Sequence, residues 1–470
     1  MTTPLHELSI TEASTKIRAR EISPVDLVGA FLDRIARFDD EIHAFLTVDA
    51  ARARAAAKTA EEEIAAGRWR GPLHGIPFAV KDNYFTEGLR TTAASRLMAD
   101  FVPDYSATAI VRLQQSGAIL LGKLNTWEYG TGTGAVDFDL FAPPAANPWN
   151  QEHFTGGSSS GPGAAVAAGM ATFALGSDTG GSVRLPAAGC GLQGIKPTFG
   201  RISRHGILPN CWSFDTAGPL AWTVEDCAVL LGALAGLDPL DTSSADVAVP
   251  DFTAELGAGV AGLRIGVVTN LTADGEAVED AILADLDRAA TAFGRAGAQL
   301  RAVELPMAPA KYRGITTTIN WAESFSIHEL DFLDRRELMG SALRDKLTTG
   351  FMVRAADYLA AQRRRRELTA ATDALFDEVD LLLSPTTYRT APRFDEPEAV
   401  VAFTTVNATS PYNLTGHPAM SVRAGLAPNG LPTAIQLAGR FFDEATILRA
   451  AYAYETELSE PIPRPTLTDA

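Results

Sequence analysis

The sequence predicts an α/β layered fold, in which helices cover one β-sheet. Stretches with apolar residues at helical spacing alternate along the chain with short, uncharged apolar runs that are typical of buried strands. Such alternation usually produces a single sheet with helices packed on it. The chain has 470 residues, and 46% of them are hydrophobic, so it carries enough apolar material for a large core.

The first part of the chain is predicted to be helical. Ser23 and Pro24 form a cap-like start for a helix that continues to Leu46 with apolar residues at helical spacing. Residues 48–67 are rich in alanine and charged residues, and they predict a second helix that ends at Gly67.

Strands and further helices follow from residue 75 onward. Glycine or polar residues flank each strand-like run and mark its ends. In order, the sequence predicts a strand within 75–84, a helix, a glycine turn and a strand within 106–125, a strand leading into a glycine turn at 171–181, a helix at 224–238, strands at 262–270, 379–386 and 432–440, and a closing helix at 443–458. Residues 238–262 are interpreted as a linker or a long surface loop.

The chain is acidic, with a formal net charge of −17. Nucleic acids and anionic membranes need a positive surface, so this charge argues against both as partners. The basic run at 363–366 lies in an acid-flanked, helix-like stretch and is interpreted as a solvated helix face. Cys190, Cys211 and Cys227 form no metal-ligand pattern and fit a reducing cytosol. With no signal peptide or membrane-length apolar run, the sequence predicts a cytoplasmic protein.

Two glycine-rich motifs match known patterns in form but not in context. GSSSG at 157–161 matches the nucleophile elbow, with Ser159 as nucleophile, but that elbow needs a preceding strand. The residues before it are Pro-rich and polar. GAGVAG at 257–262 matches G-x-G-x-x-G but precedes a strand instead of following one. We find no P-loop and no zinc spacing in the sequence, and we expect no metal and no cofactor.

A second glycine-serine run has the context that a nucleophile needs. Ser182 follows two glycines, which themselves follow an apolar strand. Consecutive glycines allow the backbone N–H groups of Thr179, Gly180, Gly181 and Ser182 to turn toward one point, as an oxyanion hole requires.

Lys81 lies inside the apolar stretch GPLHGIPFAVKDN. A lysine there must reach solvent, pair with Asp82, or be buried as a neutral amine. A buried neutral amine can act as a base near neutral pH, and Ser–Lys arrangements are an alternative to Ser–His–Asp. On the residues alone, all three interpretations stay open.

Several stretches, in order, resemble the amidase signature family: GIPFAVKDN, GGSSSG, DTGGSVRLPAAGCGLQGIKPTFGR and GPLAWTVED. The similarity extends over most of the chain, from ISPVDLV to the closing GLPTAIQLAGRFFDEATILRAA. It implies the amidase signature fold, a single large α/β/α layered domain (1–470) around a mixed, mostly parallel sheet. We expect residues 1–70 to be a helical segment packed on it, 81–203 to form the catalytic core and 312–352 to form a variable cover of the active site.

The resemblance implies a Ser–cis-Ser–Lys triad. Carried over residue by residue, Ser182 is the nucleophile, Ser158 is the bridging serine and Lys81 is the base. In this family the peptide bond before the bridging serine is cis, and Ser159 and Ser160 are expected to hold the loop and the start of the next helix. The resemblance also implies that the oxyanion-hole N–H groups belong to Thr179, Gly180, Gly181 and Ser182. It further implies that the backbone of Gly130 contacts substrate and that the side chains of Asp178 and Arg184 support the site.

The implied activity is hydrolysis of an amide or carbamate through an acyl-enzyme on Ser182. For Lys81 to be the base, burial must lower its pKa by roughly two to three units. The leading prediction is a free-standing amidase acting on linear amides. One alternative is the glutaminase subunit of a tRNA-dependent amidotransferase, which usually has MDEFAMG near the position of NTWEYGTGTG here. Another is a hydrolase of urea-like or carbamate bonds. A homodimer is left open.

The sequence predicts a neutral, partly hydrophobic substrate. Residues 312–352 are expected to cover the active-site mouth, and Arg313 is the candidate anchor if the substrate carries a carboxylate. The expected pocket residues are Ile315, Ile319, Trp321, Phe325 and Phe351, together with Trp127, Phe138 and Phe141.

Overall fold

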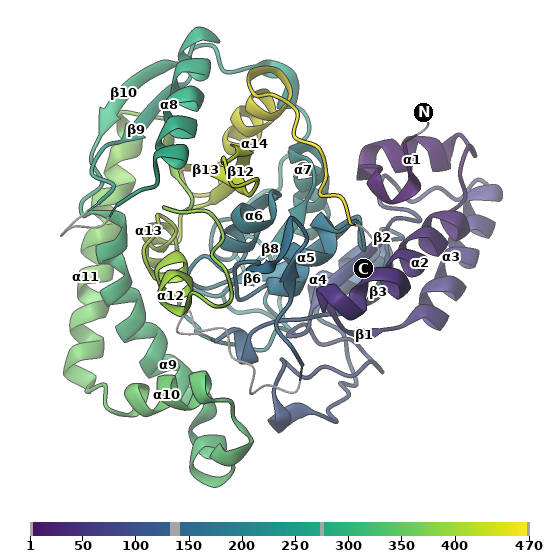
Figure 1. Cartoon of the computed structure of the whole chain (residues 1–470), viewed down its shortest axis with the longest axis horizontal. Coiled ribbons are helices and arrows are strands. Elements are labelled where there is room, and N and C mark those ends of the chain that lie inside the picture. Colours follow the sequence, from purple (N-terminus) through teal and green to yellow (C-terminus); the bar gives the residue numbers. More distant parts are fainter. Residues whose placement is uncertain (1–2, 132–141, 273–276, 468–470) are drawn as a thin grey trace.

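The computed structural model describes residues 3–131, 142–272 and 277–467. Its centre is an 11-stranded sheet with helices packed around it (Figure 1). In spatial order the strands are β1 (Phe45–Val48), β3 (Ile119–Leu124), β2 (Pro77–Lys81), β6 (Phe173–Asp178), β8 (Thr216–Ala221), β7 (Gln193–Lys196), β12 (Ala419–Leu426), β13 (Pro432–Gly439), β11 (Leu381–Pro385), β9 (Arg264–Val268) and β10 (Gln299–Val303). A separate hairpin pairs β4 (Ala146–Asn147) with β5 (Asn150–Phe154).

The sheet is mixed, as predicted, but parallel pairs do not dominate it. Parallel pairing joins β3, β2 and β6 on one side of the sheet and β11, β9 and β10 at the opposite edge. The strands between these groups pair antiparallel, from β6 and β8 across to β13 and β11. Some of these antiparallel pairs join strands that follow each other directly along the chain, such as β7 with β8 and β12 with β13.

Helices flank the sheet and form an arm beside it. They are α1 (Ile10–Arg18), α2 (Pro24–Ile42), α3 (Ala50–Ala65), α4 (Thr108–Gln115), α5 (Ser160–Ala167), α6 (Arg184–Cys190), α7 (Val224–Leu234), α8 (Asp280–Arg295), α9 (Tyr312–Asp334), α10 (Ser341–Phe351), α11 (Ala355–Asp373), α12 (Pro397–Thr405), α13 (Ser410–Thr415) and α14 (Glu444–Ala453). The long helices α9 and α11 and the shorter α10 form the arm on the left of Figure 1. Among the described residues, no helix is long and apolar enough to span a membrane.

The N-terminal helices follow the sequence prediction with one correction. The Ser23 hydroxyl accepts hydrogen bonds from the backbone of the first turn of α2, so it caps the helix as expected. The helix ends at Ile42, earlier than predicted, and His43 adopts a left-handed conformation. The residues from Phe45 then pair with β3 as an edge strand. Strand pairing therefore overrides the helical pattern at this point.

The loop at 238–262 is not a free linker. Phe252, Leu256 and Val260 are buried against the main core. The segment therefore packs as a surface loop, which is one of the two interpretations that the sequence left open.

The topology brings the predicted catalytic segments to one edge of the sheet. β2 ends at Lys81 and β6 ends at Asp178, and these two strands are parallel neighbours. The carboxyl ends of parallel neighbours lie at the same edge, where α/β proteins usually place their sites. The serine run before α5 and the glycine turn before α6 meet there, since the Ser159 N–H donates to the Ser182 carbonyl oxygen over 3.3 Å.

Candidate active site

Lys81 is fully buried at the end of β2 and contacts serine hydroxyls. Its Nζ lies 2.7 Å from Ser158 Oγ and 3.0 Å from Ser177 Oγ. Burial lowers the pKa of Lys81 to about 7, although the charges of Asp215 and Asp178 act in the opposite direction. Asp82 does not pair with Lys81. The interpretation of Lys81 as a buried amine is therefore favoured over the other two.

Asp82, which follows Lys81 in the sequence, pairs instead with a second buried lysine, Lys123. Lys123 on β3 forms an ion pair with Asp82 at 3.2 Å. Its Nζ also donates to the Tyr84 carbonyl oxygen and to Thr91 Oγ1. Lys123 thus has a complete set of structural partners, whereas Lys81 has only hydroxyl contacts.

The bridging serine follows a cis peptide bond between Gly157 and Ser158, as the resemblance implied. The Ser158 carbonyl oxygen accepts hydrogen bonds from Thr126 Oγ1 at 3.0 Å and from the Trp127 N–H at 3.2 Å. A Cβ on Gly157 would lie 2.3 Å from the Trp127 ring, so only glycine fits against this indole. The serine loop is therefore anchored on the segment after β3.

The sequence predicted that no strand precedes the serine run, and this was wrong; the rejection of Ser159 as a nucleophile still holds. A short strand, β5, does precede the serine run, although it lies outside the main sheet. Ser159 is nevertheless fully buried, and its hydroxyl donates to the Ser177 carbonyl oxygen and accepts the Ser177 N–H, both over 3.3 Å. Ser159 therefore joins the serine loop to β6, which agrees with the structural role expected for it.

Ser182 lies in the turn between β6 and α6 and is partly exposed to a pocket. Among the described residues, no acceptor or donor pairs with the Ser182 hydroxyl, and no acceptor pairs with the N–H groups of Gly180 and Ser182. These two amides suit an oxyanion hole. Gly181 departs from the prediction, because its N–H donates to Asp178 over 2.7 Å.

The conformation at Gly181 explains why a glycine is needed there. Its φ of +120° is disfavoured for residues with a side chain, and a Cβ would lie 2.4 Å from Thr409 Oγ1. Thr409 Oγ1 in turn donates to the Gly180 carbonyl oxygen over 2.9 Å. Gly181 therefore shapes the turn instead of supplying a free donor.

Asp178 and Arg184, the two predicted supporting side chains, contact each other and the turn that carries Ser182. Both are fully buried and form an ion pair at 3.0 Å. Arg184 also donates to the Thr409 carbonyl oxygen, Gln436 Oε1 and Asn413 Oδ1. Burial opposes ionisation of Asp178, but the Arg184 charge and the hydrogen bonds from Arg184 and Asn413 outweigh it and hold the pKa of Asp178 well below its usual range.

Replacing Arg184 by methionine is expected to lower the free energy of unfolding by about 3–5 kcal/mol, because Asp178 would remain buried without its charge partner. Urea denaturation measures this change. The control is Arg354→Met, which removes the exposed Arg354–Asp357 pair and should change the free energy of unfolding far less, because exposed ion pairs contribute little. Equal effects of the two substitutions would contradict a supporting role for Arg184.

Gly130 lies at the wall of the site. A Cβ at this residue would lie 3.4 Å from Ser158 Oγ and 3.8 Å from Lys81 Nζ. Its carbonyl oxygen accepts a hydrogen bond from Asn210 Nδ2 over 3.3 Å. This position is compatible with the expected contact between the Gly130 backbone and substrate.

The pocket in front of Ser182 is more polar than the sequence predicted. Its lining includes Ser182, Thr179 and Gly180 together with Trp127, Arg313, Thr316, Thr317, Asn320, Trp321 and Lys346. On α9, the residues that line it follow a helical spacing from Arg313 to Trp321. Tyr312, Ile315 and Ile319 point instead to a separate apolar cluster.

Only some of the expected pocket residues line the pocket. Trp127 and Trp321 do line the pocket, whereas Ile315 and Ile319 belong to the neighbouring apolar cluster. Phe325 packs near Met339, and Phe351 is 63% exposed. Phe138 and Phe141 lie outside the described residues. Apart from Trp321, the side of α9 that faces the site is polar, whereas the predicted Ile315 and Ile319 lie on its apolar side.

Sequence reasoning missed Lys346, the second cation of this pocket. It is buried on α10, and its Nζ lies 2.5 Å from Asn210 Oδ1 and 3.2 Å from Thr131 Oγ1. The available signal was its spacing, since Lys346 shares a helix face with the buried Leu343 and Leu347. Burial lowers the pKa of Lys346 to about 8, with opposing effects from Cys211 and Asp215. Its ammonium remains largely charged at neutral pH.

The fold and the site geometry agree with one family of enzymes. The family model described as Amidase matches residues 26–448 of the chain. The chain belongs to the amidase family. Its members share the layered fold described above, and with this membership the chain is an amidohydrolase.

Curated relatives within the amidase family are similar over nearly the full length of the chain. The A subunit of the glutamyl-tRNA(Gln) amidotransferase of Trichlorobacter lovleyi is 38% identical, covering 96% of this chain and 97% of the relative. The corresponding protein of Pelobacter propionicus is 39% identical over 96% of this chain. These names favour the predicted alternative, one chain of an amidotransferase, over a free-standing amidase. They also run against the expectation that no nucleic acid is involved.

Solved structures similar to this chain include enzymes that are described as acting on different substrates. One, described as a vestigial protein complex that reveals the evolutionary origins of an s-triazine catabolic enzyme, has a TM-score of 0.90 and 32% identity, covering 98% of this chain and all of that chain. The peptide amidase of Stenotrophomonas maltophilia has a TM-score of 0.85 and 30% identity, with the same coverage. The fold is thus shared by enzymes with different substrates.

Proposed function

We propose that this amidase-family chain is the amide-hydrolysing subunit of a multi-chain amidotransferase. It would release ammonia from a small primary amide that carries a carboxylate, such as glutamine. The similarity to amidotransferase A subunits over nearly the whole chain supports the assembly. The observation that carries the substrate class is a pair of cations in the pocket that contains Ser182, the buried Lys346 and the partly buried Arg313.

In the part of the chain that the structure describes, these two cations have no carboxylate partner. Arg313 donates to the Thr404 carbonyl oxygen over 3.2 Å, and Lys346 contacts the oxygens of Asn210 and Thr131. Within the described residues, neither forms an ion pair. A buried cation without a partner costs several kcal/mol, and a substrate carboxylate would offset that cost. This arrangement replaces the expectation of a neutral, partly hydrophobic substrate.

Hydrolysis would follow the Ser–Ser–Lys relay. Neutral Lys81 accepts the Ser158 proton while Ser158 accepts the Ser182 proton, and Ser182 Oγ attacks the amide carbon. The N–H groups of Gly180 and Ser182 stabilise the oxyanion. The relay then returns the proton to the leaving nitrogen, so that the C–N bond breaks, ammonia leaves and an acyl-enzyme remains. Water, activated by the same relay, releases the carboxylic acid.

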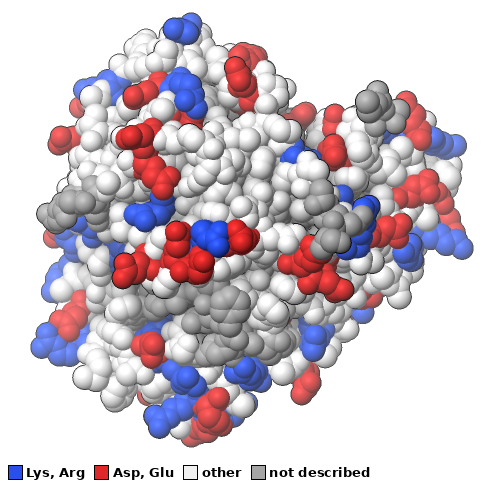
Figure 2. Space-filling view, in the orientation of Figure 1, with Lys and Arg blue, Asp and Glu red and all other residues white. Residues whose placement is uncertain are grey.

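The charge of this chain limits how a tRNA could take part. The chain carries a net charge of −17, and acidic and basic side chains are interspersed on the face shown in Figure 2. An acidic protein attracts polyanions poorly. In the proposed complex, other chains would hold most of the tRNA, and this chain would supply ammonia.

Lys346→Met is expected to lower kcat/KM for glutamine at least about 30-fold, because truncating one partner of a buried charge pair costs about 2–5 kcal/mol. The value for hexanamide, which has no carboxylate, should change much less. Kinetics of the chain co-purified with its partners measures both. The exposed Lys58→Met is the matched control. An equal loss with both substrates would contradict a carboxylate anchor.

The similarity to a peptide amidase supports a second candidate, a free-standing amidase. The chain also has NTWEYGTGTG where the amidotransferase subunits usually have MDEFAMG. Rapid hydrolysis of a blocked dipeptide amide or a carbamate by the isolated chain, without activity on glutamine in any complex, would favour this candidate.

A further inference from the structure

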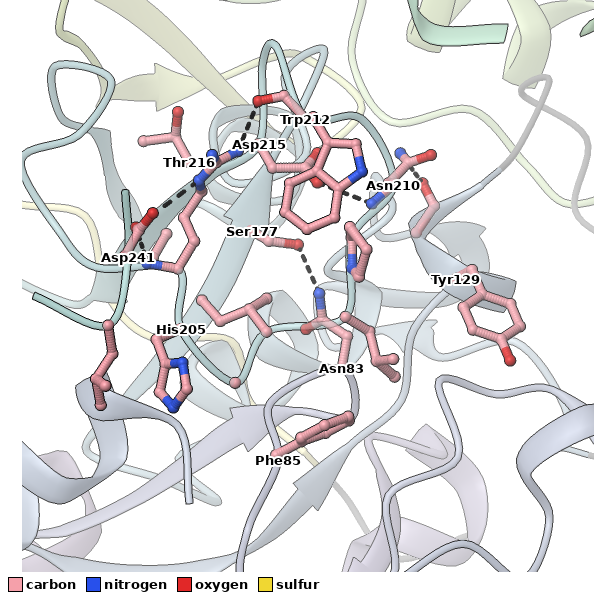
Figure 3. Close-up of a pocket in the computed structure, with 18 of the residues that line it drawn as sticks. Asn83, Phe85, Tyr129, Ser177, His205, Asn210, Trp212, Asp215, Thr216 and Asp241 are labelled. Atoms are coloured by element: carbon pink, nitrogen blue, oxygen red, sulfur yellow. Dashed lines mark hydrogen bonds and ion pairs between the residues drawn. The ribbon is translucent and has the colours of Figure 1, made fainter. Parts of the chain in front are cut away.

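A second cavity adjoins the pocket of Ser182. It has a volume of about 480 Å³, and Figure 3 shows residues that line it. Gly130 and Asn210 line both cavities. Ser182 itself is not among the residues that line it within the described chain. We propose that this cavity binds a neutral aromatic molecule that carries an N–H or O–H donor.

The walls and mouth of the cavity suit an aromatic ring. Tyr105 makes an edge contact with Phe85, with ring centroids 5.4 Å apart, and stacks on His205 at 5.2 Å. Trp212 and Leu240 also line the cavity, yet they are 57% and 67% exposed. Large exposed apolar side chains around a concave site are typical of ligand entrances. Aromatic walls favour flat rings, which stack on them or meet them edge-on.

The floor of the cavity presents an unused hydrogen-bond acceptor. Asn83 is only 4% exposed, and its Nδ2 donates to Ser177 Oγ over 3.1 Å. Its Oδ1 is buried and has no hydrogen-bond partner among the described residues. In Figure 3 the Asn83 amide lies at the cavity with its nitrogen toward Ser177. A buried acceptor calls for a donor, and a ligand N–H or O–H would supply it.

The charged groups that line the cavity are already satisfied, which favours a neutral ligand. The Arg204 guanidinium donates to Ser243 Oγ and to the Trp212 carbonyl oxygen, and its backbone N–H donates to Asp241. Asp215 accepts hydrogen bonds from Thr179 Oγ1 and from two backbone N–H groups. In the pocket of Ser182, by contrast, the two cations have no carboxylate partner among the described residues, which favours a charged ligand there.

A molecule held by Asn83 would lie close to the catalytic base. Ser177 Oγ contacts Asn83 Nδ2 at 3.1 Å and Lys81 Nζ at 3.0 Å. The ligand and Lys81 are therefore linked through the Asn83 amide and one serine hydroxyl. Occupation of the cavity should alter the reactivity of Ser182 without blocking access to it.

Calorimetric titration with 2-naphthol tests the binding site. We expect one molecule to bind per chain, and 2-methoxynaphthalene, which lacks the O–H donor, to bind at least tenfold more weakly. Trp212→Ala should weaken binding of 2-naphthol at least tenfold. Phe351→Ala, which removes an exposed aromatic ring from α10, should not change it. Equal affinities for the two naphthalenes, or no binding, would overturn the proposal.

The rate of Ser182 labelling by a fluorophosphonate separates this cavity from the substrate pocket. At saturating 2-naphthol the rate should reach a new, non-zero value that differs at least twofold from the rate without it, and Trp212→Ala should lose this effect. Enzyme already labelled on Ser182 should still bind 2-naphthol. A labelling rate that falls to zero, or binding that disappears after labelling, would place the ligand in the pocket of Ser182 and overturn the proposal.

Discussion

Ser182→Ala is expected to abolish fluorophosphonate labelling and to lower amide hydrolysis by at least about 10⁴-fold. The reason is that the proposed relay forms the acyl-enzyme on this hydroxyl, whereas the proposed oxyanion donors and the pocket would remain. Labelling followed by mass spectrometry of the modified peptide measures the first effect, and single-turnover kinetics measures the second. The fold should persist, because the Ser182 hydroxyl has no hydrogen-bond partner among the described residues.

Ser159→Ala is the matched control for this prediction. Ser159 is a neighbour in the serine run that the elbow pattern would select, but its hydroxyl is buried against the Ser177 backbone. The substitution should leave labelling on Ser182 and lower stability by about 1–3 kcal/mol, since the Ser177 N–H loses its acceptor. Label that persists in Ser182→Ala and maps to Ser159 would reverse the assignment.

Lys81→Met should lower the rate of acylation by at least about 10³-fold and remove the acid limb of the pH profile. Burial lowers the pKa of Lys81 to about 7, and only the neutral amine can accept a proton. Wild-type activity should therefore rise as the pH increases through about 7 and stay high in mild alkali. The residual activity of the variant should not show this rise. Stopped-flow measurement of acylation between pH 5 and 9 tests both statements.

Lys196 offers a control with the same burial and a similar pKa. It is fully buried, and burial lowers its pKa to about 7. Its Nζ contacts the Pro197 carbonyl oxygen at 2.9 Å, not a catalytic serine. Lys196→Met should therefore keep the acid limb near pH 7. Loss of that limb in Lys196→Met, with its retention in Lys81→Met, would exclude Lys81 as the base.

The sequence predicts local features well where the chemistry is local. The start of α2 at Ser23, the strand that ends at Lys81 and the glycine turn after β6 all follow from capping and apolar spacing over a few neighbouring residues. The pairing of β12 with β7 does not, because it joins residues more than 200 positions apart. The predicted preference for parallel pairs was wrong, because antiparallel pairing also joins strands that are close in sequence, such as β7 with β8 and β12 with β13.

In the site, too, residues within local motifs could be predicted, whereas contacts that depend on the folded chain could not. Ser158 and Lys81 could be assigned from motifs, and the structure brings them into contact. Gly181 could not be excluded as an oxyanion donor, because its N–H is taken by a carboxylate that only the folded turn positions. The cations Arg313 and Lys346 were missed or undervalued, because their pocket forms only where α9 and α10 meet the glycine turn. An apolar helix face predicts burial but not the side on which the ligand lies.

The network around Arg184 also bears on the order of events during protein synthesis. Arg184 holds the nucleophile turn through the Thr409 carbonyl oxygen, which is 225 residues further along the chain. At a translation rate of roughly 5–20 residues per second, this partner leaves the ribosome about 10–45 s after Arg184. All three triad residues therefore emerge well before the turn that carries the nucleophile can take its final shape. A nascent chain would therefore lack the finished turn until Thr409 has been made.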